Sequence, residues 1–181
     1  MERISIHIGE YHASTRSVII ETLLGSCVAV CLIDPIQRIG GMNHILLPGK
    51  ASIDSCDAVS RYAVNAMELL INKIMALGGN RKLLKAKVFG GAHVIPCISR
   101  ANDMGRINAK FVLKFLDMEG ISVLSQDLGG QEARRIYFRT DTGEVLLKRI
   151  LKRHSVGARE LITQERLRSK VDETGDITLF T

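Results

Sequence analysis

Residues 17–47 read SVIIETLLGSCVAVCLIDPIQRIGGMNHILL and decide the fold, because three runs of apolar and β-branched residues follow one another with two short interruptions. The first run, residues 17–24, ends at Gly25-Ser26. The second, 27–33, ends at the turn Asp34-Pro35-Ile36-Gln37, in which proline holds its favoured second position. The third run covers residues 38–47. The pattern predicts three β-strands, of which the second and third form a hairpin.

The length of the hairpin loop decides whether Cys27 and His44 can meet. If the loop comprises the four residues 34–37, Cys27 lies directly opposite His44, with the two Cβ atoms roughly 4.5–5.5 Å apart. With a five-residue loop, the two side chains leave on opposite faces of the sheet. A functional pair therefore requires the four-residue loop or a bulge.

Hydrophobic periodicity in the rest of the chain predicts both helices and strands. Apolar residues at three- and four-residue spacing predict helices over residues 57–77 and 105–119, each ended by glycine. Further strands are expected at residues 83–89, 121–125, 133–140 and 144–150. We therefore expect one mixed α/β (α+β) domain over residues 1–155, with strands packed as a β-sandwich and helices outside. A basic C-terminal extension, residues 156–181, is expected to carry a charged helix and a short strand.

The composition indicates a soluble globular protein. Hydrophobic residues make up 46% and charged residues 24% of the 181 residues. No stretch approaches the roughly 18 consecutive apolar residues of a membrane span, and the charged N-terminal segment lacks the apolar region of a secretory signal. These features predict a cytoplasmic protein with no membrane insertion.

The charge balance points to an acidic partner. The formal net charge is +6, whereas aromatic residues make up only 4% and tryptophan is absent. Nucleic-acid-binding proteins usually add a stacking surface or a basic recognition helix, and the sequence has neither motif. An acidic protein surface is therefore the expected partner, and nucleic acid is not.

Of the four cysteines, Cys27 has the most distinctive surroundings. In a reducing compartment disulfides are uncommon, and no Cys-x-x-Cys pair suggests a zinc site, so we expect no metal and no cofactor. Cys31, Cys56 and Cys97 are interpreted as structural. Cys27 follows a glycine break, which allows a substrate to approach the backbone closely.

A cysteine beside a histidine is the arrangement that attack on an amide requires. A free thiol is ionised only to a few per cent near neutral pH, and a neighbouring histidine can take its proton and return it to the departing amine. Backbone N–H groups at Gly25, Ser26 and Cys27 could stabilise the oxyanion, and Asn43 could orient the scissile amide. The alternative is that Cys27 and His44 are ordinary core residues and that Asn43 serves sheet packing.

Several ordered blocks of sequence resemble the chemoreceptor glutamine deamidases of the CheD family. The series spans about residues 8–150, and its specificity comes from the order of the blocks. The blocks are residues 23–32 (LLGSCVAVCL) with Asp34-Pro35, 41–44 (GMNH) with Leu47-Pro48, 87–92 (KVFGGA), Gly105 with Asn108, 127–130 (DLGG) with Arg134-Arg135, and 142–145 (TGEV).

The resemblance implies a protein-glutamine glutaminase that converts glutamine side chains of methyl-accepting chemotaxis receptors to glutamate and releases ammonia. It implies Cys27 as nucleophile and His44 as its base, in a β-sandwich related to the cytotoxic necrotizing factor deamidases. Some family members also act as methylesterases or bind the phosphatase CheC.

The sequence departs from the family pattern at the third catalytic residue. The family has a threonine six places before the cysteine, and Glu21 occupies that position here, with Thr22 next to it. Neighbours in a regular strand point to opposite faces, so Thr22 could serve only if a bulge or register shift turned it inward. Glu21 could instead orient His44 as a carboxylate.

Other positions leave alternatives open. Gly90 and Gly91 are expected either to let the backbone pass close to the catalytic strand or simply to end a strand. Arg134 and Arg135 are expected either to hold acidic receptor helices or to be solvated strand residues. A non-catalytic adaptor that binds receptor or a CheC-type phosphatase is the main alternative function, ahead of a cysteine peptidase.

Overall fold

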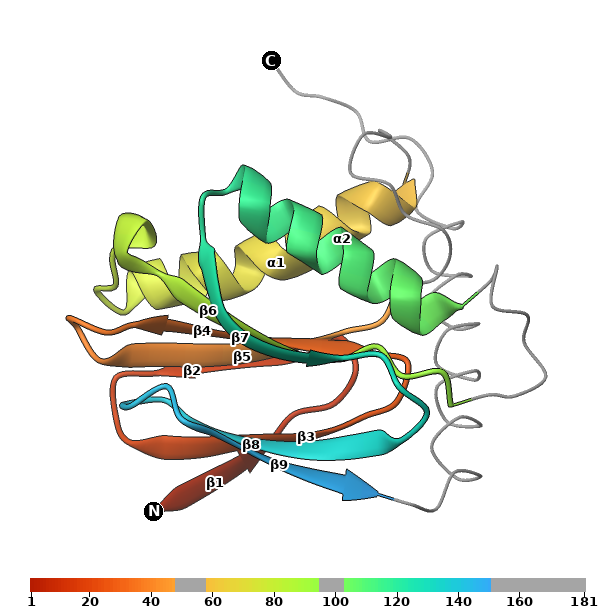
Figure 1. The fold of residues 1–181 in the computed structure, drawn as a ribbon. Helices are drawn as coiled ribbons and strands as arrows, with labels where there is room; N and C mark the ends of the chain where they lie inside the picture. The colour runs from red at the N-terminus through yellow and green to blue at the C-terminus, as the bar shows by residue number, and fades with distance from the viewer. Residues whose placement is uncertain (48–57, 95–102, 151–181) are drawn as a thin grey trace.

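The computed structural model describes residues 1–47, 58–94 and 103–150, which form three layers (Figure 1). Helices α1 (Ala58–Ala76) and α2 (Met104–Met118) lie on one face of a five-stranded sheet, and a four-stranded sheet lies against its other face. The mixed α/β class is thus confirmed, with both helices on the same sheet. The extension at residues 156–181, Cys56 and Cys97 lie outside the described residues.

Both sheets contain one parallel pair of strands among antiparallel ones. In the five-stranded sheet the parallel pair is β6–β7, and the order is β2 (Tyr11–Ser14), β5 (Ile39–Ile45), β4 (Val28–Asp34), β6 (Lys85–Gly90) and β7 (Ser122–Leu128). In the four-stranded sheet it is β1–β3, and the order is β1 (Glu2–Ser5), β3 (Val18–Leu24), β8 (Ala133–Arg139) and β9 (Val145–Ile150). A short 3-10 helix, η1 (Arg81–Leu83), precedes β6.

The hairpin β4–β5 has a different register from the predicted one. Asp34 pairs with Ile39, so the four-residue loop begins at Pro35, one residue later than expected. The Asp34 carboxylate accepts hydrogen bonds from the N–H groups of Ile36 (2.9 Å) and Gln37 (3.0 Å), which keeps Asp34 at the end of the strand. The prediction that Cys27 lies directly opposite His44 is therefore wrong.

His44 instead pairs with Ala29, and Cys27 precedes the first residue of β4. The shift moves the pairing by two positions, which preserves the side-chain alternation. Cys27 consequently stays on the same face of the sheet as His44, diagonally displaced from it. That face looks toward the four-stranded sheet, where Cys27 packs in a buried cluster with Ala29, Met42 and Leu46.

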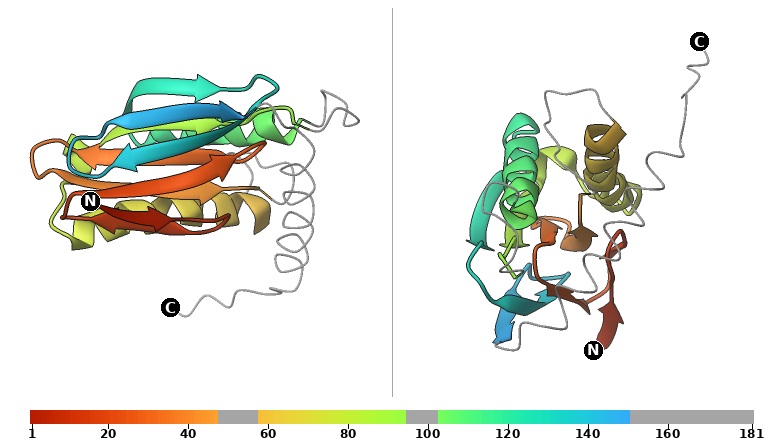
Figure 2. Two further views of the ribbon diagram at one scale, coloured as in Figure 1. Left: turned by 90° about the horizontal axis from the view of Figure 1, so that it is seen from below. Right: turned by 90° about the vertical axis from the view of Figure 1, so that its right-hand side faces the viewer.

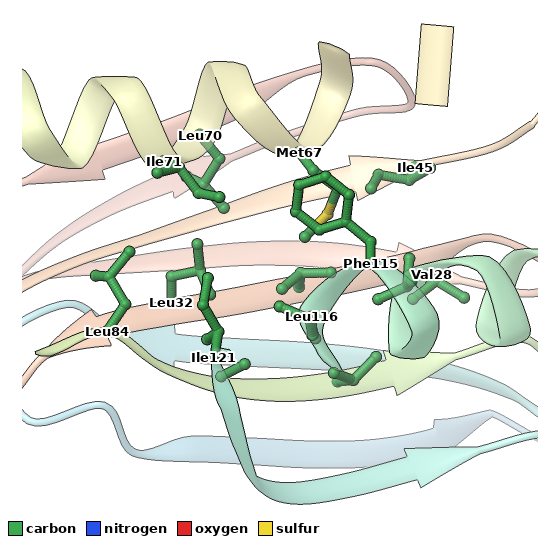
Figure 3. Close-up of a cluster of buried hydrophobic side chains, with 14 of the residues drawn as sticks. Val28, Leu32, Ile45, Met67, Leu70, Ile71, Leu84, Phe115, Leu116 and Ile121 are labelled. Carbon is green, nitrogen blue, oxygen red and sulfur yellow. The ribbon is translucent and has the colours of Figure 1, made fainter. Parts of the chain in front are cut away.

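The middle layer is buried on both faces. Every residue of β4 and β5 is buried, whereas β3 alternates between buried and partly buried residues. One face of β4 and β5 packs against the apolar stripes of α1 and α2, in the cluster that includes Val28, Leu70 and Phe115 (Figure 3). Residues on the other face are therefore held between two sheets, away from water.

Candidate active site

Gly25, Ser26 and Cys27 form the corner at which the chain leaves the four-stranded sheet after β3 and enters the five-stranded sheet at β4. The Gly25 carbonyl accepts a hydrogen bond from the N–H of Ala92 (2.8 Å), and the Cys27 carbonyl accepts one from the N–H of Gly91 (2.7 Å). The segment that follows β6 therefore fixes both ends of the corner.

Asn108 holds the middle of the corner. Its buried Nδ2 donates to the Ser26 carbonyl (2.9 Å), and its Oδ1 accepts from the N–H of Leu47 (3.1 Å). One amide on α2 thus joins the corner to the segment after β5. Sequence reasoning assigned no such role, although an asparagine on the same helix face as Phe111 and Phe115 is a signal for a buried hydrogen-bonding residue.

Gly90 is required for the close approach of β6 to Cys27. Its φ is 115°, in the left-handed region that favours glycine, and a Cβ at this position would overlap the carbonyl oxygen of Cys27. The expectation that Gly90 lets the backbone pass close to the catalytic strand is confirmed. The other expectation, that Gly90 ends a strand, is also confirmed, because β6 ends at Gly90.

Thr22 determines which nitrogen of His44 carries the proton. Thr22 Oγ1 donates a hydrogen bond to the carbonyl of Ile6 (2.8 Å) and lies 2.7 Å from His44 Nδ1. A hydroxyl has one hydrogen and the Ile6 carbonyl can only accept, so the hydroxyl accepts its second bond from Nδ1–H. Nε2 is then the unprotonated nitrogen. It is buried and has no hydrogen-bond partner among the described residues.

The turn between β1 and β2 holds the backbone of His44. The His44 carbonyl accepts from the N–H of Gly9 (2.9 Å), and its N–H donates to the carbonyl of Glu10 (3.0 Å). Together with the Ile6 carbonyl, this turn contacts both members of the Thr22–His44 pair. No sequence signal marked the turn, because its contributions come from the backbone.

The structure distinguishes between the two candidates for the third residue. Thr22 is buried between the sheets and pairs with Ile136 in regular register, so neither a bulge nor a shift is needed to turn it inward. Glu21 points to the outer face, where its carboxylate lies 3.9 Å from Arg135. Thr22 and not Glu21 therefore contacts His44 among the described residues.

Burial keeps His44 neutral. Removal from water is the main reason that the pKa of His44 falls to about 3, and electrostatic repulsion from nearby His7 is the smaller one. Burial has the opposite effect on a thiol and raises the pKa of Cys31 well above its ordinary value, in keeping with its interpretation as a core residue. His44 is therefore neutral near pH 7, with its proton on Nδ1 and an acceptor at Nε2.

This pKa predicts a pH dependence of stability. The unfolded chain protonates His44 below about pH 6.5, whereas the folded protein does so only near pH 3. The stabilising contribution is complete above pH 6.5 and decreases by up to about 1.4 kcal/mol per pH unit as the pH falls toward 3. Urea unfolding near pH 7 and near pH 5 measures it. His44→Gln should show a smaller loss between the two pH values, and an equal loss in both proteins would contradict the assignment.

Tyr62 on α1 is a further polar side chain near the turn that holds His44. Its hydroxyl lies 3.8 Å from the position that a Cβ on Gly9 would occupy. Burial raises the pKa of Tyr62, and the negative charge of an ionised Cys27 raises it further.

Asn43 and Arg134 have structural surroundings. Asn43 Oδ1 accepts from the N–H of Val30 (3.1 Å) and Nδ2 donates to the Ala66 carbonyl (3.1 Å), on the sheet face opposite His44. This favours the packing alternative for Asn43. Arg134 is buried and bonds to the Asp127 carboxylate, so it is neither a solvated residue nor one that a receptor can reach. Arg135 is partly exposed, as expected of a strand residue.

Arg134 supports the corner through a loop. Its guanidinium donates to the carbonyls of Asp127 (2.6 Å) and Gly129, and the N–H of Gly129 donates to the Gly90 carbonyl (2.9 Å). The loop after β7 is thereby fixed against the same glycine that contacts Cys27.

Over the described ranges there is no group of three or more histidine, cysteine or acidic residues placed to hold a metal ion. None of the described helices is long and apolar enough to cross a membrane.

Comparisons with known proteins agree with the sequence blocks. The family model described as "CheD chemotactic sensory transduction" matches residues 46–149. "Probable chemoreceptor glutamine deamidase CheD 1" of Shewanella oneidensis is 44% identical, over 99% of this chain and 89% of its own length. "Probable chemoreceptor glutamine deamidase CheD 2" of Chromobacterium violaceum is 41% identical, over 98% of this chain and 89% of its own length.

A solved structure, Bacillus licheniformis hypothetical protein YfiH, is similar over 65% of this chain and 49% of its own, at 11% identity and a TM-score of 0.41, which is too slight to establish a shared fold. The relation to cytotoxic necrotizing factor deamidases stays a prediction. The sequence relatives, in contrast, extend over nearly the whole chain. This protein therefore belongs to the CheD family.

Proposed function

We propose that this protein is a cytoplasmic chemoreceptor glutamine deamidase, which hydrolyses glutamine side chains of methyl-accepting chemotaxis receptors to glutamate. The observation that carries the proposal is the orientation of His44. Its Nδ1 is occupied by Thr22, and Nε2 remains unprotonated and without a described partner, on the sheet face that Cys27 shares. The names of the sequence relatives, which are chemoreceptor glutamine deamidases, support the choice of substrate.

In the first half of the reaction, His44 Nε2 takes the proton of the Cys27 thiol, and the thiolate attacks the carboxamide carbon of the glutamine. A carbon–sulfur bond forms while the π electrons move onto the oxygen. The intermediate then collapses, the carbon–nitrogen bond breaks, and the nitrogen leaves as ammonia with the proton that His44 held. A thioester between Cys27 and the receptor side chain remains.

In the second half, water hydrolyses the thioester. His44 Nε2 takes a proton from the water as its oxygen bonds to the carbonyl carbon. The carbon–sulfur bond breaks, and the sulfur recovers the proton from His44. The products are a glutamic acid side chain, which releases a proton to become glutamate, and free Cys27, so atoms and charges balance without a cofactor.

The corner supplies a rigid frame for the oxyanion. Its three carbonyls are held by Ala92, Asn108 and Gly91, so the N–H groups of Ser26 and Cys27 keep fixed directions during the reaction. We assign the oxyanion to these backbone groups. Cys27 has no exposed surface, so a glutamine side chain must displace the groups around the sulfur in order to reach it.

The proposal is tested by incubating the full-length protein with a purified chemoreceptor cytoplasmic fragment in ¹⁸O-labelled water. Peptide mass spectrometry should show glutamine converted to glutamate with one ¹⁸O incorporated, together with one ammonia released per glutamate. An unrelated protein rich in exposed glutamine serves as the control for selectivity. A receptor fragment that remains unmodified would overturn the proposal.

A further inference from the structure

The outer face of the four-stranded sheet is uncovered in the described part of the protein. Both helices lie on the far side of the five-stranded sheet (Figure 1), and the view from below in Figure 2 shows β1, β3, β8 and β9 with no described helix or strand over them. Leu146 on β9 is 69% exposed there. A face with exposed apolar side chains and no covering layer is a candidate for contact with a partner.

A hollow of about 910 Å³ lies on this face. Ile19, Tyr137 and Leu146 provide its apolar surface, and the guanidinium of Arg3 lies 6.0 Å from the centre of the Tyr137 ring. Lys87 of β6 also lines it, so the hollow extends past β9, the last strand of the sheet, toward the second sheet. None of the lining residues belongs to the Cys27–His44 site.

The hollow carries a positive charge that the described residues do not neutralise. Its lining contains four cationic side chains and a single acidic one, Glu144. Arg139 Nη1 lies 2.9 Å from Glu144 Oε2, so these two charges compensate each other. The other three cations form no ion pair within the described ranges, and they are Arg3, Lys87 and Lys148.

We propose that this hollow, lined by Arg3, Ile19, Lys87, Tyr137, Leu146 and Lys148, is a second docking surface for an acidic segment of the substrate receptor. The inference rests on the proposed function. Three uncompensated cations around an apolar floor require a partner with carboxylates beside an apolar side chain. Each turnover also converts a neutral glutamine to a glutamate, so the receptor itself becomes the more acidic ligand as modification proceeds.

A protein segment fits the hollow better than a small molecule. Small-molecule sites fix their ligand through a few polar groups buried in a cleft. The charged groups here are instead long side chains on an open sheet face, with Arg3 and Lys148 exposed. A second contact of this kind holds the receptor near the enzyme and raises the local concentration of its glutamines. It therefore contributes to binding and not to the chemical step.

The test compares the double variant Arg3→Glu/Lys148→Glu with a matched double variant, Lys73→Glu/Lys110→Glu, which makes the same charge change on exposed positions of α1 and α2. Binding of a purified chemoreceptor cytoplasmic fragment is measured with Cys27→Ala present in every protein, so that turnover does not alter the ligand. We expect the hollow variant to raise Kd about tenfold and to reduce its dependence on NaCl concentration. The α1/α2 variant should stay within about twofold of the parent.

Turnover by the proteins that retain Cys27 separates this proposal from the proposed function. The hollow variant should raise KM about tenfold with kcat within about twofold. Unchanged Kd and KM in a folded hollow variant, or equal effects in both double variants, would overturn the docking surface while leaving the deamidase function intact. Binding that depends on the hollow, in a protein that never deamidates the receptor, would keep the docking surface and refute the function.

Discussion

Replacing Cys27 with alanine is expected to lower kcat for receptor deamidation by roughly 10⁴-fold or more, because the reaction loses the atom that forms the covalent intermediate. Cys31→Ala is the matched control. Cys31 lies on the same strand face and is equally buried, but burial raises its pKa so that it remains a thiol. Its replacement should leave kcat within about twofold. Mass spectrometry of the receptor fragment measures both rates, and equal yields from Cys27→Ala and the parent protein would exclude Cys27 as nucleophile.

Thiol alkylation provides a second measurement on the same pair of cysteines. A nucleophile whose proton His44 can accept should react first with iodoacetamide near pH 7, while Cys31 stays unmodified in the folded protein. Equal and slow labelling of both thiols would favour the non-catalytic adaptor. Glu21 in place of the family's threonine would favour a non-catalytic adaptor if His44 had no hydroxyl partner. Thr22 provides that hydroxyl, so the substitution at Glu21 does not argue for the adaptor.

Replacing Thr22 with valine is expected to lower kcat by roughly 10²- to 10⁴-fold, as happens when the group that orients a catalytic histidine is lost. Valine has nearly the same shape but cannot accept the Nδ1–H, so the proton is free to move to Nε2, where it blocks base catalysis. The buried Nδ1–H would also lose its partner, which costs about 1–3 kcal/mol of stability.

Thr22→Ser is the control that separates orientation from packing. Serine keeps the hydroxyl between the Ile6 carbonyl and His44, so it should recover most of kcat despite the lost methyl group. Glu21→Ala, on the outer face of the same strand, should leave kcat nearly unchanged. The ¹⁵N chemical shifts of His44 should show protonated Nδ1 in the parent and in Thr22→Ser. Normal kcat in a folded Thr22→Val protein would refute the orienting role.

The β4–β5 hairpin shows which features a local sequence pattern can predict and which it cannot. The two apolar runs and the Pro35 turn predicted the β4–β5 pair, but they left the loop length open between four and five residues. The loop has four residues but begins one residue later than expected, because the Asp34 carboxylate accepts the N–H groups of Ile36 and Gln37 and, from a distant segment, that of Asn80 (2.8 Å). No local signal encodes that contact. Cys27 and His44 are therefore not directly opposite each other. They still lie on the same face of the sheet, because a register shift of two positions preserves the alternation of side chains.

The helices α1 and α2 and the hairpin of β8 and β9 were predicted with small errors at their ends. Strand β2 was missed, because Tyr11–Ser14 is short and lacks an apolar run, and its pairing with β5 supplies the regularity that its own residues do not. Arg134 was misplaced for a similar reason. A charged residue in a strand is usually solvated, whereas Arg134 finds its partners in the partly exposed loop at Asp127 and Gly129.

The sequence by itself determined the strand and helix content, the family, and the choice of Cys27 and His44, because periodicity, glycine breaks and ordered motif blocks are properties of the chain alone. Only the tertiary structure decided that Thr22 and not Glu21 meets His44. The residues lie on strands of different sheets, and their contact depends on how the two sheets are stacked. The proton position on His44 follows from the Ile6 carbonyl, a backbone group that any residue would supply and that no sequence pattern can mark.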